Sequence, residues 1–169
     1  MLHRVNSFLP PVIMVSLYYT FIHPYLSYCC SVWGNTNKSL LCSLQRAQNR
    51  AVKATFLLPR LYPSSDLYND TGIAPLDHII GKNTLYLAHS AFLGTLPPTL
   101  QQFFSRTGSG RYFSSLRNSS RRFILPKRSS TAGQGSPVYQ SILLWNSIPS
   151  DVPLFLSAKA LFRRVFPIQ

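Results

Sequence analysis

Prolines limit where helices can run in this chain of 169 residues, which contains thirteen of them. Proline is tolerated in the first turn of a helix and interrupts a helix elsewhere. The Pro-Pro pair that begins at Pro10 therefore suits a helix start, and we expect a buried helix over residues 12–22 that Pro24 ends or kinks. A second short helix over residues 25–33 follows, and we expect Gly34 to close it as a left-handed cap.

The stretch from residue 40 to residue 57 contains no proline and has the clearest helical pattern in the chain. Apolar residues recur at spacings of three and four, as on the buried face of an amphipathic helix. That expected face consists of Leu40, Leu41, Leu44, Ala47, Ala51, Val52 and Ala54. Another face carries Arg46, Arg50 and Lys53 within about 60° of one another around the helix axis. The pattern therefore predicts a ridge of three cations on this helix.

Helical patterns continue on both sides of a change in composition. We expect a helix over residues 75–92 that Gly94 stops, followed by a short helix through Leu100 and Phe104. Residues 105–136 then hold nine Ser, four Gly and seven Lys or Arg and no acid, which is typical of a basic, weakly ordered segment.

The end of the chain returns to apolar patterns. Within the basic segment, residues 122–126 form one apolar interruption, which predicts a short strand or a docked extended piece. Helices are expected over residues 137–147 and 158–166, and Trp33 and Trp145 are expected core anchors because both lie within apolar runs.

These patterns together predict a mainly α fold in four segments. They are a three-helix unit over residues 8–58, a second helical unit over 73–104, the basic segment over 105–136 and a helical tail over 137–166.

Charge is distributed very unevenly between the two signs. Seventeen Lys and Arg face four aspartates and no glutamate, which gives a net charge of +13. A polyanionic partner such as RNA or DNA is therefore expected, and binding without sequence specificity, because no groove-reading motif is present. Metal clamps and acid–base pairs need several carboxylates in one place, and Asp66, Asp70, Asp77 and Asp151 show no such spacing. We expect no enzyme activity, no catalytic or metal-binding residue, no cofactor and no small-molecule substrate.

Cysteine usage favours a reducing compartment. Cys29, Cys30 and Cys42 form neither a CxxC pair nor a Cys/His finger, so zinc is not expected. Three reduced, mostly buried thiols fit a cytoplasmic or nuclear protein.

Residues 5–37 contain no Lys, Arg, Asp or Glu, which leaves a second interpretation open. Such a stretch could serve as a signal or membrane anchor over residues 8–33 in a small membrane-anchored or secreted protein. Sequons at Asn37, Asn69 and Asn118 would fit that alternative. The prolines and scattered polar residues in the stretch count against it, and a membrane is not the expected partner.

Two blocks of short motifs occur in a fixed order. The first contains LY at 17–18, PYLSY at 24–28, VWG at 32–34 and LQRAQNRA at 44–51, and the second contains LWNSIP at 144–149 and ALFRR at 160–164. This order and spacing resembles the C-terminal part of the reverse transcriptase of non-LTR (LINE-type, jockey-like) retrotransposons, over about residues 8–166. In that family a helical thumb region follows the polymerase palm, so the resemblance implies that residues 8–58 are thumb-like.

The chain departs from the family pattern in its catalytic residues. The family's palm, with its Tyr/Phe-x-Asp-Asp motif, lies upstream of the region that this chain resembles, and no two aspartates are adjacent here. Two-metal phosphoryl transfer needs carboxylates around both ions. The resemblance therefore implies a truncated, non-catalytic fragment of an RNA-directed DNA polymerase, whose apolar surface could support self-association. A host-adopted interaction module that uses the apolar face near residues 25–33 is a further alternative.

Ten cations are the candidate nucleic-acid-binding residues. Three lie on the predicted ridge, and seven lie in the basic segment with Tyr112, Phe113 and Phe123 interleaved as possible stacking partners for unpaired bases. The set is Arg46, Arg50, Lys53, Arg106, Arg111, Arg117, Arg121, Arg122, Lys127 and Arg128. The alternative is that the ridge is an ordinary solvated face and the segment a solubilising linker.

Overall fold

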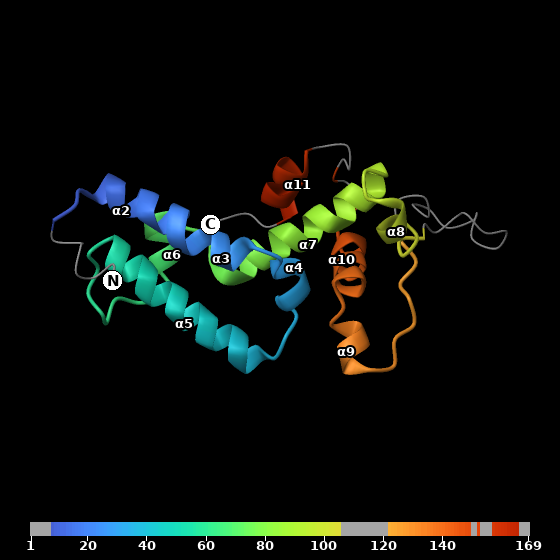
Figure 1. The fold of residues 1–169 in the computed structure, drawn as a ribbon, viewed down its shortest axis with the longest axis horizontal. Coiled ribbons are helices and arrows are strands. Elements are labelled where there is room, and N and C mark those ends of the chain that lie inside the picture. Colours follow the sequence, from blue (N-terminus) through green and yellow to red (C-terminus); the bar gives the residue numbers. More distant parts are fainter. Residues whose placement is uncertain (1–7, 106–121, 150–151, 153–156, 166–169) are drawn as a thin grey trace. The chain divides into compact units, whose positions relative to one another are not determined.

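The computed structural model describes residues 8–105, 122–149, 152 and 157–165, and this part of the chain is mainly α-helical, as the sequence predicts (Figure 1). It forms two compact units. The described residues of the first unit are 8–30 and 36–80, and those of the second unit are 31–35, 81–105, 122–149, 152 and 157–165. The division into four segments stays a prediction.

The first unit begins with a helical run in three parts, namely α2 (Pro11–Leu17), a π-helical stretch η1 (Tyr18–Ile22) and α3 (His23–Ser27). Pro24 lacks an N–H group and cannot donate to the carbonyl one turn earlier. The backbone widens just before it, where the N–H of His23 donates to the carbonyl oxygen of Tyr18, five residues back. A π-bulge of this kind lets a helix pass a proline, so Pro24 modifies the helix and does not end it.

The predicted helix over residues 25–33 is wrong in its middle and at its cap. Tyr28 is extended and Cys29 has a left-handed φ of 49°, after which a short helix α4 (Cys30–Trp33) begins. Gly34 is not among the left-handed glycines of the described chain, which are Gly72 and Gly94. The thiol of the buried Cys30 donates to the carbonyl oxygen of Ile79 at 3.7 Å. This long-range contact accompanies the break in the helix at Tyr28 and Cys29. The local sequence pattern gives no indication of the contact.

Helix α5 (Lys38–Thr55) is the long element of the first unit and packs against α2, η1 and the short helix α6 (Leu67–Thr71) (Figure 1). The core between these elements is built on Tyr18, Val52, Leu67 and Ile73. The fully buried positions of α5 are Gln48, Val52 and Thr55, whereas Leu40 is 61% exposed and Ala47 is also exposed. The helix was predicted correctly, and Val52 of its expected face is fully buried, but Leu40 and Ala47 were wrongly placed on that face and Gln48 and Thr55 were missed.

Polar contacts explain why a glutamine occupies that buried face. The amide of Gln48 donates to the hydroxyl of Tyr18 at 3.0 Å and to the carbonyl oxygen of Ala74 at 2.9 Å. Gln45 accepts the backbone N–H of Leu76 at 3.1 Å, and its amide also contacts the hydroxyl of Tyr68. Burial raises the pKa of both tyrosines. Buried polar groups with partners cost little, so this network can replace apolar packing.

Helix α7 (Leu76–Leu93) begins in the first unit and continues into the second. Gly94 ends it with a φ of 73°, as predicted, and the N–H of Thr95 donates to the carbonyl oxygen of Ser90 at 3.0 Å. This six-to-one bond is the Schellman arrangement. A short helix α8 (Pro98–Gln101) follows.

The second unit also contains α9 (Thr131–Gln134), α10 (Pro137–Asn146) and α11 (Ala158–Val165). Trp145 is 2% exposed, and its ring centroid lies 5.1 Å from that of Phe92 and 5.9 Å from that of Phe123. Its role as a core anchor is confirmed, whereas Trp33 is only half-buried. The side-chain amide of Asn146 holds the backbone of Phe123, because its oxygen accepts the Phe123 N–H at 3.1 Å and its nitrogen donates to the Phe123 carbonyl oxygen at 2.9 Å. The predicted docked piece at residues 122–126 therefore lies against α10.

Within the described ranges, no helix has both the length and the apolar character needed to cross a bilayer.

Candidate nucleic-acid interface

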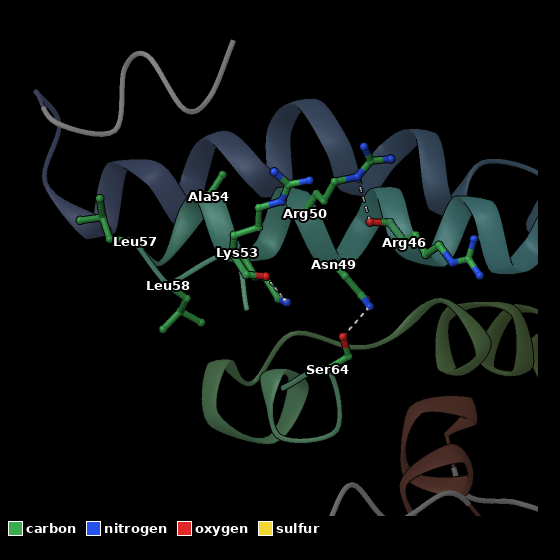
Figure 2. A pocket seen from close by; sticks show the side chains of 9 residues that line it. Arg46, Asn49, Arg50, Lys53, Ala54, Leu57, Leu58 and Ser64 are labelled. Atoms are coloured by element: carbon green, nitrogen blue, oxygen red, sulfur yellow. Dashed lines mark hydrogen bonds between the residues drawn. The ribbon is translucent and has the colours of Figure 1, made fainter. Parts of the chain in front are cut away.

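The ridge predicted on α5 is present. Arg46 and Arg50 lie one turn apart and are exposed, as the helical spacing requires. The Nε of Arg50 donates to the carbonyl oxygen of Arg46 at 3.4 Å, which directs the Arg50 side chain back along the helix (Figure 2). The terminal nitrogens of both guanidinium groups therefore remain on the surface of α5.

A pocket of about 770 Å³ lies between this ridge and the connector that follows α5. We call it the α5 pocket, and the residues that line it are Arg46, Asn49, Arg50, Lys53, Ala54, Leu57, Leu58, Arg60 and Ser64 (Figure 2). Four of these nine residues are cations and none is a carboxylate. The pocket thus combines high positive charge with an apolar side formed by Ala54, Leu57 and Leu58.

Lys53 has a different role from the one predicted for it. Its ammonium donates to the carbonyl oxygen of Tyr62 at 2.6 Å and to that of Arg60 at 3.1 Å. An ammonium has three donors, so two of them already hold the connector against α5. Lys53 contributes positive charge to the pocket, but it acts first as a structural clamp and is a poor candidate for a direct phosphate contact.

Arg60 is the cation that sequence reasoning missed. It lies outside any helix, in a stretch that the sequence identifies only as a connector, and its side chain is exposed. Two tertiary contacts bring this stretch back to α5, namely the Lys53 clamp and a hydrogen bond from the amide of Asn49 to the hydroxyl of Ser64 at 3.2 Å. No helical spacing could have indicated Arg60, because these tertiary contacts position it.

The basic segment is described only in its second half. Lys127 and Arg128 are exposed and line a second pocket of about 530 Å³, together with Leu125, Pro126, Ser129 and Tyr139. Tyr139, on α10, is an aromatic lining residue that was not predicted. Arg122 is also exposed.

The remaining candidates have different outcomes. Arg106, Arg111, Arg117, Arg121, Tyr112 and Phe113 lie outside the described residues. Phe123 was a candidate for base stacking, and that expectation is wrong. The side chain is 2% exposed and packs edge-on against Phe104, with ring centroids 5.4 Å apart. Its apolar surface is used in the core, so it has none left for a base.

The chemistry available at these sites is anion binding. Among the residues that the structure describes, no three His, Cys, Asp or Glu side chains gather as they would around a metal ion. Asp70, in the first unit, accepts a hydrogen bond from the hydroxyl of Tyr62. Arginine at the α5 pocket presents a planar fork of donors that matches phosphate oxygens.

Comparison with known proteins gives no match, since no family model, curated protein or solved structure is significantly similar to this chain.

Proposed function

We propose that this protein is a non-catalytic fragment of a non-LTR retrotransposon reverse transcriptase that binds RNA or DNA without sequence specificity. The motif order from residue 17 to residue 164 supports the origin. The observation that carries the binding is the α5 pocket, where four cations and no carboxylate line one hollow. Phosphates satisfy that charge, and phosphate contacts carry no sequence information.

Arg46, Arg50 and Arg60 are the residues we assign to phosphate contact at this pocket. Each contact with a duplex releases condensed counterions, so three contacts give a slope of log K against log salt of about −2.7. Binding should therefore be weak at physiological salt and much stronger at low salt. Lys53 adds long-range attraction while it keeps the connector in place.

A fluorescence anisotropy titration of a labelled duplex at several salt concentrations tests the binding. The informative variant is Arg46→Gln/Arg50→Gln, and the matched control is Arg163→Gln/Arg164→Gln, which removes two exposed arginines from the last turn of α11. The first variant should reduce the slope to about −0.9, and the control should change it less. A dissociation constant that is indifferent to salt would count against the proposal.

The origin and the lack of catalysis have their own tests. Genomic DNA upstream of the Met1 codon should contain a decayed or in-frame palm with its Asp-Asp motif, and an unrelated upstream sequence would remove the assignment. The pure protein should incorporate no nucleotide on a primed template with magnesium or manganese. Measurable incorporation would overturn the non-catalytic assignment, whatever the binding assay shows.

One observation favours a second candidate, a protein-interaction module. Phe21 and Tyr25 lie four residues apart on the first helical run and are 62% and 81% exposed. Residues at this spacing share one face of a helix. If that face binds another protein, a pull-down should recover one partner in fixed stoichiometry, and Phe21→Ser/Tyr25→Ser should abolish its recovery. Unchanged recovery would argue against the module.

A further inference from the structure

Leu57 occupies a backbone position that normally belongs to glycine. Its φ is 57°, in the left-handed region, and the N–H of Leu58 donates to the carbonyl oxygen of Lys53 at 2.9 Å. This six-to-one bond is the Schellman ending of α5, and Leu57 is its left-handed residue. A branched side chain is strained there, whereas glycine is not.

The Leu57 side chain gains no core packing in return for this strain. It is 63% exposed, so burial does not explain why a leucine occupies the site. Figure 2 shows Leu57 and Leu58 at the C-terminal end of α5, with Arg50 and Arg46 further along the same helix. Backbone strain that no packing offsets is typical of positions with a binding role. The exposed leucine also lines the α5 pocket, where an apolar group would otherwise be out of place among cations.

We infer that the α5 pocket takes an unpaired nucleotide of a single-stranded RNA or DNA, with phosphates at Arg46 and Arg50 and the base against Leu57. The inference rests on the proposed function and makes it more specific. A duplex presents phosphates and sugars on its outside and keeps the faces of its bases stacked, so an apolar wall gains nothing from it. An unpaired nucleotide offers both a phosphate and an apolar base face.

The size and composition of the pocket agree with this occupant. A volume of about 770 Å³ lies within the range of pockets that hold small organic ligands. Asn49 and Ser64 add polar groups to the lining beside the cations, and their own hydrogen bond joins the two walls. The pocket therefore has separate places for an anion and for an apolar surface.

The test compares a labelled oligothymidylate of about 12 nucleotides with a duplex of equal phosphate number at one salt concentration. Leu57→Ala truncates the Leu57 part of the apolar wall, and Leu57→Gly removes that side chain entirely and also relieves the strain. The matched control is Leu40→Ala, because Leu40 is 61% exposed on the same helix and does not line the pocket. Thermal unfolding of each variant shows whether it is folded.

The single strand should bind more tightly than the duplex. Both Leu57 variants should lose about three- to tenfold in affinity for the single strand, with the duplex and the Leu40→Ala control unchanged. Leu57→Gly should lose this affinity while its melting temperature rises by a few degrees. A purely structural role for Leu57 cannot produce that combination.

Two results would overturn the inference and leave the proposed function intact. The first is single-strand binding that is unchanged in both Leu57 variants. The second is a duplex that binds as tightly as the single strand in a salt-dependent manner. If neither probe binds in a salt-dependent manner, the proposed function fails and the inference fails with it.

Discussion

The ammonium of Lys53 donates to the carbonyl oxygen of Tyr62 at 2.6 Å, and this contact ties the C-terminal half of α5 to the connector that carries Arg60. A charged donor on a backbone carbonyl forms a stronger bond than a neutral one. The connector has no helix until α6 begins at Leu67, so it depends on such contacts for its course. Lys53 therefore matters more for the shape of the α5 pocket than for the positive charge of the pocket.

Replacing Lys53 with methionine should destabilise the first unit by about 1–2 kcal/mol, because the carbonyl groups of Arg60 and Tyr62 lose a charged donor. Methionine keeps the length of the apolar stem, so lost packing contributes little. Urea unfolding followed by circular dichroism measures the change. Arg50→Gln is the comparison, because the bond of Arg50 within the described residues is a long one to Arg46 in its own helix. If the two variants unfold at the same urea concentration, Lys53 does not act as a structural clamp.

Arg60→Gln should weaken nucleic-acid binding although Arg60 lies in a loop. Loss of one phosphate contact should make the salt slope less steep by about 0.9. The melting temperature should not change, because the backbone of Arg60 accepts the Lys53 bond and the substitution leaves that carbonyl group in place. Lys82→Gln removes an exposed cation outside the α5 pocket and is the control. If Lys82→Gln changes the salt slope as much as Arg60→Gln does, the effect of Arg60 comes from overall charge and not from its place in the pocket.

The comparison of Arg50 with Arg60 shows what the sequence could predict at the site. Helical periodicity places Arg50 beside Arg46, because residues four apart share a face whatever the rest of the fold does. The position of Arg60 depends on two polar side chains, Lys53 and Asn49, that bond to the connector. Such tertiary contacts leave no periodic signal in the sequence.

The same distinction applies to the fold. The extent of α7 and its end at Gly94 could be predicted, since apolar spacing and a left-handed glycine are local properties. The burial of Gln48 could not be predicted, because its partners Tyr18 and Ala74 lie thirty and twenty-six residues away in the sequence. A hydrophobic pattern separates polar from apolar residues and does not say which polar residues find buried partners.

Stability of the first unit should fall when the pH rises above about 10. Burial raises the pKa of Tyr18 and of Tyr68 above the ordinary value of 10.0. Below pH 10 both hydroxyls are protonated in the folded and unfolded chains, and their contribution to stability is fully present. Above it the unfolded chain releases its protons first, so it binds fewer protons than the folded chain and unfolding becomes easier.

Urea midpoints at about pH 8 and pH 11 measure this decline. Tyr18→Phe should make the decline less steep, although it also costs stability at pH 8 by leaving the Gln48 amide without one acceptor. Tyr25→Phe is the control, because it removes a hydroxyl whose side chain is 81% exposed. A midpoint that is the same at both pH values would show that the two hydroxyls titrate alike in the folded and unfolded chains.

Asn146→Ala should release the extended piece that precedes Lys127 and Arg128. The Asn146 side chain accepts the N–H of Phe123 at 3.1 Å and donates to its carbonyl oxygen at 2.9 Å, as a neighbouring strand would. Loss of both bonds should cost about 1–3 kcal/mol and speed amide hydrogen exchange at Phe123. Tryptophan fluorescence follows the unfolding, because Trp33 and Trp145 both belong to the second unit.

Ser147→Ala is the matched control for that variant, since Ser147 is exposed and its hydroxyl donates to the carbonyl oxygen of Leu144, in the last turn of α10. The Phe123 ring is buried against Phe104 and Trp145, so apolar packing alone could hold the segment in place. If packing dominates, Asn146→Ala will unfold at the same urea concentration as Ser147→Ala, with the Phe123 amide still protected. If the side-chain bonds dominate, exchange at Phe123 will rise in the Asn146 variant alone, because among the described residues the Asn146 side-chain oxygen is the acceptor of the Phe123 N–H.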